Sequence, residues 1–306
     1  MQQEQWTPDQ IPDLTGRRAL VTGVTSGLGK VVVSTLAGRG AEVVMAARSE
    51  PKLAAAVEDV QRRLPSATVR PLLLDLADQA SVRRAAAEAA SYGPLNLLVN
   101  NAGVMAPPYQ RTVDGFELQM ATNHFGHFAL TGLLLPQLIA SGDARVVSVS
   151  SQGHRMARSA PLDDPRRSHG RYQRWPVYGQ TKLANLLFIF ELDRRAHAAG
   201  LPLKALAAHP GVSATGLMRT GHGTGPSGRI MDAAFMAIGQ PAEMGAMSIL
   251  MAASADLPGS TYVGPGGPGE ARGMPKVVTA SRLARDPEAA RRLWEVSQDA
   301  TGVAYP

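Results

Sequence analysis

Tyr178 and Lys182 are the two side chains whose types and spacing suggest chemistry. They lie four positions apart, so on a helix they share one face, one turn from each other. A neighbouring positive charge favours phenolate, so the ammonium group is expected to lower the pKa of the phenol from its reference value of about 10. The pair is a candidate acid/base unit, although two fixed positions also fit a surface lysine beside a packed tyrosine.

A glycine-rich turn near the N-terminus offers a phosphate site. Residues 22–29 read Thr-Gly-Val-Thr-Ser-Gly-Leu-Gly, between an apolar run and a helical pattern. Glycines allow a tight turn, and the backbone N–H groups that begin a helix favour a pyrophosphate. The spacing Gly-x-x-x-Gly-x-Gly therefore predicts a dinucleotide site, against the alternative of a structural β-α turn.

Arg48 follows the second strand-like run. A carboxylate near this point would bind the ribose diol of NAD and repel a 2′-phosphate, whereas a guanidinium pairs with that phosphate. The sequence therefore favours NADP over NAD, unless Arg48 is a solvated loop residue.

The elements that must position these groups alternate along the chain. The strand-like runs are apolar without clean alternation, as in a parallel sheet covered on both faces. They fall at residues 19–23, 42–46, 68–74, 96–100, 145–149, 203–208 and 261–264. Helical patterns fall at residues 28–38, 51–64, 79–90, 113–140, 177–199, 229–239, 241–253 and 286–301.

This alternation predicts an α/β fold, a doubly wound parallel sheet (Rossmann) of about seven strands with helices on both faces. No linker interrupts it, so we expect a single domain over residues 1–306. The cofactor half would cover about 14–140 and the catalytic and substrate half about 141–306.

Composition and charge limit the expected location and binding partners of the protein. The chain has no cysteine, no long apolar run and a polar N-terminus without a signal peptide, which together favour the cytoplasm and no membrane span. A net charge of +6 comes without basic runs interleaved with aromatics, so no nucleic acid is expected. His124 and His127 lie three apart with no third ligand nearby, so we expect packed histidines and no metal.

Five motifs in order carry a family resemblance. They are the turn at residues 22–29, Asn-Asn-Ala-Gly at 100–103, Ser-Ser at 150–151, Tyr178-x-x-x-Lys182 and His-Pro-Gly at 209–211. Together they resemble the short-chain dehydrogenase/reductase family from about residue 14 to the end. The run Asn-His-Phe-Gly-His-Phe at 123–128, the lengthened segment between Ser151 and Tyr178, and the ending Thr-Gly-Val at 301–303 look like its retinol-dehydrogenase-like branch.

The resemblance implies a catalytic set. Tyr178 would exchange a proton with the substrate oxygen, and Ser151 would hydrogen-bond that oxygen. Lys182 would bind the nicotinamide ribose and lower the pKa of Tyr178, and Asn123 would hold a water that connects Lys182 to solvent. Ser150 would replace Ser151 if the strand register slipped by one.

The resemblance also implies how NADP would be held. Asp75 would face the adenine, although residue type alone lets it be a helix N-cap. The implied cofactor-binding residues are Gly23, Thr25, Ser26, Gly27, Leu28, Gly29, Arg48, Asp75, Leu76, Asn101, Ala102, Gly103, Tyr178, Lys182, Pro210, Gly211, Val212 and Thr215.

The expected function is an NADP-dependent oxidoreductase that transfers a hydride between nicotinamide and a small apolar ketone, aldehyde or alcohol. The alternatives are a non-catalytic NADP-binding sensor or scaffold, and an epimerase or dehydratase of the same fold. Relatives often pair through the helices expected at 113–140 and 177–199, so a homodimer or homotetramer is expected.

Two further segments are expected to lie near the substrate. Six arginines between residues 152 and 174 form either a solvated rim or a site for an anionic substrate tail. Methionines suit a broad apolar pocket, whereas Met247 and Met251 are expected in the core. The other methionines after the Pro-Gly motif are Met231, Met236 and Met244.

Overall fold

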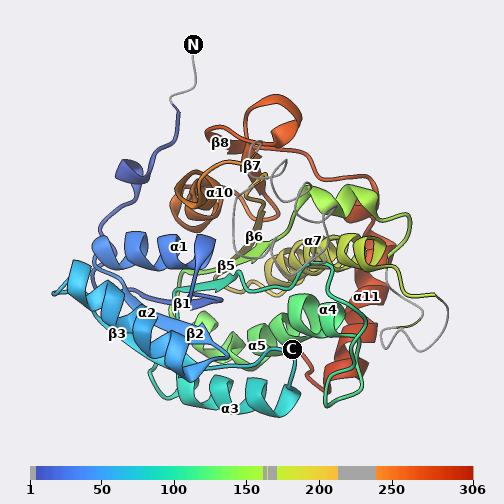
Figure 1. Ribbon diagram of the computed structural model, residues 1–306, viewed down its shortest axis with the longest axis horizontal. Coiled ribbons are helices and arrows are strands. Elements are labelled where there is room, and N and C mark those ends of the chain that lie inside the picture. Colours follow the sequence, from blue (N-terminus) through green and yellow to red (C-terminus); the bar gives the residue numbers. More distant parts are fainter. Residues whose placement is uncertain (1–4, 161–163, 165–170, 213–238, 306) are drawn as a thin grey trace, which may run out of the picture.

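A computed structural model describes residues 5–160, 164, 171–212 and 239–305. Within these ranges, eight strands form one sheet in the order β3-β2-β1-β4-β5-β6-β7-β8 (Figure 1). All neighbours pair in parallel except β7 and β8, which are antiparallel. The strands are β1 Arg18–Thr22, β2 Glu42–Ala47, β3 Val69–Leu73, β4 Leu97–Asn100, β5 Ala144–Val149, β6 Leu203–Ala208, β7 Tyr262–Pro265 and β8 Pro275–Val277.

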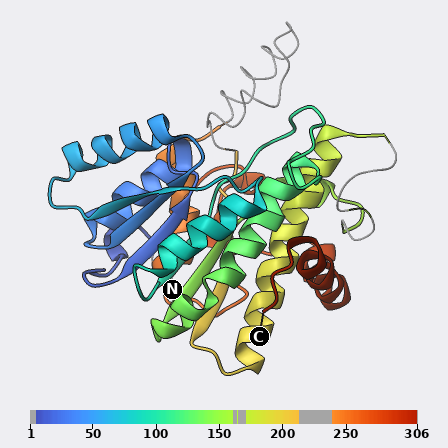
Figure 2. The ribbon, with the colours of Figure 1, turned by 90° about the horizontal axis from the view of Figure 1, so that it is seen from below.

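Helices cover both faces of the sheet (Figures 1 and 2). One layer holds α1 Gly27–Gly38, α2 Glu50–Arg63 and α10 Ala242–Ser254. The other layer holds α3 Gln79–Ala90, α4 Leu118–Met120, a π-helix Ala121–Phe125, α5 Gly126–Leu133, α6 Leu135–Ala140, α7 Arg174–Ala198 and α11 Pro287–Thr301. Short 3₁₀ turns lie at Pro8–Gln10, Gln152–Met156, Pro268–Glu270 and Leu283–Arg285.

Successive strand residues face opposite helical layers. Leu20 and Val44 belong to the core beneath α5 and α7, whereas Val21 and Val43 belong to the core beneath α1 and α10. Because both faces are buried, both sets must be apolar. This explains why the strand sequences lack alternation, and it confirms the predicted doubly wound sheet.

The differences from the predicted elements have local causes. The sheet has one strand more than predicted, because β8 is a short edge strand whose Lys276 and Val277 are exposed and leave no apolar run. The single helix predicted at residues 113–140 is wrong. The chain becomes helical only at Leu118, passes through a π-helix turn, and restarts after Leu134, next to Pro136, which has no N–H to donate. The helix predicted at 229–239 lies outside the described residues.

Helix α11 covers α5 and α7 (Figure 2). Trp294 is 2% exposed, and its ring centroid lies 5.2 Å from that of Phe128, 5.8 Å from Phe188 and 4.5 Å from Tyr305. The guanidinium of Arg195 on α7 lies 4.5 Å from the same ring. The C-terminal helix therefore buries the apolar side of the helix that carries Tyr178 and Lys182.

Replacing Trp294 with alanine should destabilise the fold by about 3–5 kcal/mol, because the lost ring leaves a cavity between three helices. Denaturant unfolding would measure this difference. The exposed neighbour Glu295 supplies a control, since Glu295→Ala removes a side chain from the outer face of the same helix. Equal unfolding midpoints for the two variants would contradict a stabilising role for α11.

Candidate active site

A cavity of about 850 Å³ lies along the carboxyl ends of the central strands. In a doubly wound sheet, ligands bind at this edge. It runs from the turn after β1 and the end of β2 to the start of α7 and the turn after β6. All the expected site residues line it except Asn123, which packs behind it, and Thr215, which lies outside the described residues.

The glycine-rich turn after β1 is held tightly against the turn after β4. Gly23 has φ +74°, and a Cβ there would lie 2.8 Å from the Cα of Ala102. A Cβ on Gly29 would lie 2.3 Å from the carbonyl oxygen of Gly23. The Asn101 side-chain Nδ2 donates to the Thr22 carbonyl at 2.7 Å. These contacts leave the start of α1 open to the cavity, which suits a pyrophosphate.

Two cationic side chains line this cavity near the end of β2. Arg48 follows β2, and Lys52 lies in the first turn of α2; both are exposed and line the cavity. The sequence argument missed Lys52, although its position four residues after Arg48 was a usable signal. A pair of cations at this point fits a phosphate on the adenosine ribose.

Asp75 is not the helix N-cap. Its Oδ1 accepts from the Ala77 backbone N–H at 2.9 Å, in a turn directly after β3. Asp78 caps α3 instead, because its side chain accepts from the N–H of Ala80. Asp75 therefore stays at the cavity wall with Leu76.

Tyr178 and Lys182 share one face of α7, and both are buried, at 6% and 4% exposed. The Lys182 Nζ lies 5.8 Å from the Tyr178 ring centroid and donates to the Val149 carbonyl at 3.0 Å. Burial lowers the pKa of Lys182 to about 8. Burial also raises the pKa of Tyr178, and the hydrogen bond with Ser151 opposes this rise. The expected lowering of the Tyr178 pKa by Lys182 is therefore not found: burial raises that pKa, and Ser151 is the group that opposes the rise.

Two glycines allow the turn after β5 to press against Tyr178. A Cβ on Gly153 would lie 3.0 Å from Cε1 of the phenol ring. A Cβ on Gly179 would lie 2.8 Å from the Gly153 carbonyl oxygen. Any side chain at either position would push the turn away from α7. The sequence argument passed over both glycines, although one follows Tyr178 directly.

The two serines after β5 point to different partners. The Ser150 hydroxyl donates to the Lys182 carbonyl at 2.8 Å and is buried. The Ser151 hydroxyl accepts from the Gly153 N–H at 3.0 Å and is the serine that interacts with Tyr178. This geometry favours Ser151 over Ser150 as the residue beside a substrate oxygen.

Asn123 joins two walls of the site from within the π-helix. Its Oδ1 accepts from the Val104 N–H at 2.7 Å, and its Nδ2 donates to the Val104 carbonyl and to the Thr181 hydroxyl, each at 2.9 Å. Thr181 precedes Lys182 on α7. The side chain of Asn123 therefore fixes the loop after β4 against the helix that carries Lys182.

The two histidines after Asn123 are packed inside the fold. His124 contacts the Ser297 hydroxyl at 2.8 Å, and His127 contacts that of Thr22 at 2.9 Å. Burial lowers their pKa values to about 3 and about 4, so both rings are neutral. Among residues 5–160, 164, 171–212 and 239–305, no cluster of three metal-ligating side chains occurs.

Apolar side chains surround Tyr178 at the edge of the cavity. Met105, Ala106 and Trp175 pack against Tyr178, and Met156, which is 48% exposed, also lines the cavity. None of these residues was predicted. Met105 and Ala106 lie in a loop, which has no periodic pattern, and Trp175 lies in the first turn of α7. As predicted, Met247 and Met251 pack against the core, where they are partly buried. Met244 does not line the cavity, contrary to the prediction, and Met231 and Met236 lie outside the described residues.

The described arginines of the 152–174 segment lie outside the cavity lining. The Arg155 guanidinium donates to the Thr279 carbonyl at 2.7 Å, and Arg158, Arg171 and Arg174 are exposed. None of these four lines the cavity. Arg166 and Arg167 fall in the part of the chain that is not described.

Comparisons with known proteins agree with this geometry. Residues 17–161 match the family model for short chain dehydrogenase. Retinol dehydrogenase 13 of Homo sapiens is 36% identical over 300 residues, which cover 96% of this chain and 87% of that protein. The chain belongs to the short-chain dehydrogenase/reductase family. Its similarity to retinol dehydrogenases places it in the retinol-dehydrogenase-like branch.

Two other relatives extend the comparison. Polyprenol dehydrogenase of Mus musculus is 38% identical over 308 residues, covering 96% of this chain and 87% of that protein. The crystal structure of an uncharacterized protein from Mycobacterium Paratuberculosis matches with a TM-score of 0.81 at 43% identity, covering 99% of this chain and all of that one. The chain is thus an NAD(P)-dependent dehydrogenase of this family, acting on CH–OH groups. None of its described helices is long and apolar enough to cross a membrane.

Replacing Lys182 with methionine should stabilise the unliganded protein at pH 7. The pKa of Lys182 falls from 10.5 to about 8 on folding, so the unfolded chain binds the proton more tightly than the folded one. Burying the charge then costs about 3 kcal/mol at and below pH 8, and the cost disappears as pH rises toward 10.5. The Val149 carbonyl keeps a partner in Asn185 at 3.1 Å.

Denaturant unfolding at pH 7 and at about pH 10 would measure this effect. The gain should be largest at pH 7 and should shrink at the higher pH, while activity is lost at both. Lys276→Met is the control, because Lys276 is exposed on β8. A methionine variant less stable than wild type at pH 7 would show that the buried ammonium stabilises the fold.

Proposed function

We propose that this chain is an NADP-dependent oxidoreductase that interconverts an apolar alcohol and the corresponding ketone or aldehyde. The observation that carries the proposal is the continuity of the cavity. One space joins the phosphate turn and Arg48 to Ser151, Tyr178 and Lys182. A dinucleotide lying along it would bring its reactive ring to the buried phenol.

Each residue of the proposed site has a separate role. NADP, when bound, supplies or accepts the hydride. Tyr178 gives a proton to the substrate oxygen during reduction and takes it back during oxidation, and Ser151 holds that oxygen. Lys182 binds the nicotinamide ribose, and its positive charge favours the phenolate. Asn123 holds α7 in place and, through a water, links Lys182 to solvent.

NADP is favoured by charge at the ribose end. Arg48 and Lys52 both line the cavity there, and together they would neutralise a 2′-phosphate. The remaining cofactor contacts are those proposed from the sequence, from Gly23 to Val212, with Thr215 outside the described residues.

The substrate class follows from the apolar wall. Met105, Met156 and Trp175 surround the approach to Tyr178, and flexible methionines accept varied apolar shapes. Two relatives are named retinol dehydrogenase and polyprenol dehydrogenase, and both names specify apolar alcohols. The non-catalytic alternative fits less well, because it gives no reason to bury a phenol and an ammonium group together. Nothing in the site favours an epimerase or dehydratase.

Two expectations stay predictions. One is a cytoplasmic location. The other is a homodimer or homotetramer, and here the apolar side chains of α7 that suggested pairing are buried within this chain. A pairing surface on the described residues would therefore have to be a different one.

Replacing Tyr178 with phenylalanine should lower turnover by at least about 100-fold, because only the proton donor is removed. The test follows loss of NADPH absorbance with a panel of apolar ketones and aldehydes. Cofactor affinity, measured by NADPH fluorescence, should stay near that of wild type. A wild-type chain that binds NADPH but turns over no member of the panel would favour the sensor alternative.

The cofactor preference should reverse when the cations are replaced. Arg48→Asp should reduce kcat/KM with NADPH by about 10- to 100-fold and improve it with NADH, because a carboxylate repels the 2′-phosphate. Lys52→Ala should give a smaller loss in the same direction. A wild-type preference for NADH would overturn the assignment, whatever the variants do.

A further inference from the structure

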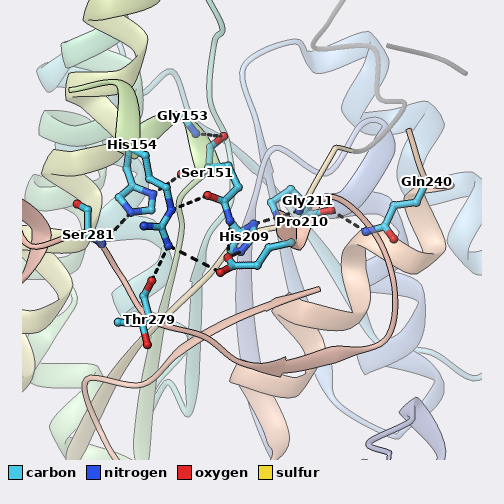
Figure 3. Close-up of polar contacts among 12 residues, drawn as sticks. Ser151, Gly153, His154, His209, Pro210, Gly211, Gln240, Thr279 and Ser281 are labelled. Carbon is cyan, nitrogen blue, oxygen red and sulfur yellow. Dashed lines mark hydrogen bonds and ion pairs between the residues drawn. The ribbon is translucent and has the colours of Figure 1, made fainter. Parts of the chain in front are cut away.

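Residues 266–274, which form the turn of the β7–β8 hairpin, contact the part of the site that follows β6. The backbone N–H of Val212 donates to the Ala271 carbonyl at 2.8 Å, and the Gly273 N–H donates to the Gln240 side chain at 3.0 Å. That side chain in turn donates to the Pro210 carbonyl at 2.8 Å. Figure 3 shows Gln240 beside Pro210 and Gly211, with Ser151 and Gly153 across from His209. The hairpin is therefore joined to the cavity wall after β6.

Glu270, at the tip of this hairpin, contacts both walls. Its Oε2 accepts from the Gln152 side chain and lies 2.9 Å from Nε2 of His209. Its Oε1 lies 3.7 Å from the guanidinium of Arg155. Gln152 and Arg155 belong to the turn that begins at Ser151, and their own side chains are bonded at 2.9 Å. One carboxylate thus ties the turn after β5 to the turn after β6.

The contact to His209 sets the tautomer of the ring. A carboxylate only accepts, so Nε2 carries the proton and Nδ1 is left as an acceptor. Nδ1 lies 3.2 Å from the Gly211 backbone N–H, which donates to it. Burial lowers the pKa of His209 to about 3, so this is a hydrogen bond from a neutral ring and not an ion pair. The chain Glu270, His209, Gly211 therefore orients a turn whose glycine has φ +65°.

Glu270 also has an unfavourable backbone. Its φ is +55°, a left-handed conformation that costs a side-chain-bearing residue about 1 kcal/mol or more. Glycine would adopt this conformation freely. On backbone conformation alone, glycine would be the more stable residue at this position. We therefore attribute the presence of glutamate to the contacts of its carboxylate.

We propose that Glu270 is a positioning residue of the active site, which holds the turn bearing Ser151 and Gly153 against the turn bearing Pro210 and Gly211. The inference rests on the proposed function, because it assumes that Ser151 orients the substrate and that the Pro210 turn faces the nicotinamide. Glu270 itself touches neither the cavity nor the proposed reacting atoms. It acts through Gln152 and His209.

Two variants separate this role from a structural one. Glu270→Gly removes the carboxylate and relieves the backbone, and the Ala271 carbonyl still holds Val212. Relief of the backbone partly offsets the loss of the acceptor for the buried Nε2–H of His209. Thermal stability should therefore fall only modestly, while kcat with an apolar ketone falls by about 10- to 100-fold through loss of alignment. The KM for NADPH should change less than kcat.

Glu270→Gln should restore much of the activity. An amide oxygen in the place of Oε2 still accepts from Gln152 and from His209, and only the longer contact to Arg155 is lost. We expect kcat within about threefold of wild type, since the two shorter hydrogen bonds remain. The matched control is Arg272→Ala, which removes an exposed charge from the same hairpin.

The outcomes are distinct. Wild-type turnover by Glu270→Gly, or parallel losses of kcat and thermal stability in both variants, would overturn the positioning role. A wild-type chain without turnover would instead refute the proposed function. In that case the hydrogen exchange of the Gly153 and Gly211 amides in Glu270→Gly still tests whether the carboxylate holds the two turns.

Discussion

The burial of Lys182 is the constraint on which the site depends. Burial away from water lowers the pKa of an ammonium group unless anionic or polar groups surround it. Here the described partner of its Nζ is one carbonyl, that of Val149. The unliganded site therefore stores an unfavourable charge that a bound anionic cofactor would relieve. If Lys182 binds the cofactor as proposed, stability of the empty fold and affinity for the cofactor are opposed at this residue.

The rest of the second half is arranged around that buried pair. Asn123 fixes the start of α7 through Thr181, and α11 covers its apolar side with Trp294. The turn after β5 lies on the phenol because Gly153 and Gly179 have no side chains. A small displacement of α7 would break all of these contacts together, so the helix is held on three sides.

The sequence predicted those parts of the molecule whose signals are local. Apolar runs located seven of the strands, and the glycine spacing located the turn after β1 that lines the cavity. It failed where the deciding contact is distant. Gln152 and Glu270 are bonded across 118 residues, and no local pattern pairs them. The π-helix around Asn123 was missed for a related reason, because an extra residue in one turn leaves the composition of a helix unchanged.

The structure also shows why residue types alone gave the wrong direction for the pKa shift of Tyr178. Charge proximity between Tyr178 and Lys182 was correctly foreseen, but burial was not part of that argument. Desolvation raises the pKa of the Tyr178 phenol and lowers the pKa of the Lys182 ammonium group, so it disfavours both charged forms at once.

Among the described residues, the sheet ends in two edge strands, β3 and β8, and no further strand pairs with their outer edges. Each carries a proline and a cation: Pro71 with Arg70 on β3, and Pro275 with Lys276 on β8. Proline has no N–H to offer an incoming strand. Lys276 adds a positive charge that repels an identical β8 edge, whereas Arg70 on β3 is paired with Glu42. Both margins are thus poor templates for edge-to-edge aggregation, which protects the long hydrophobic sheet between them from polymerising.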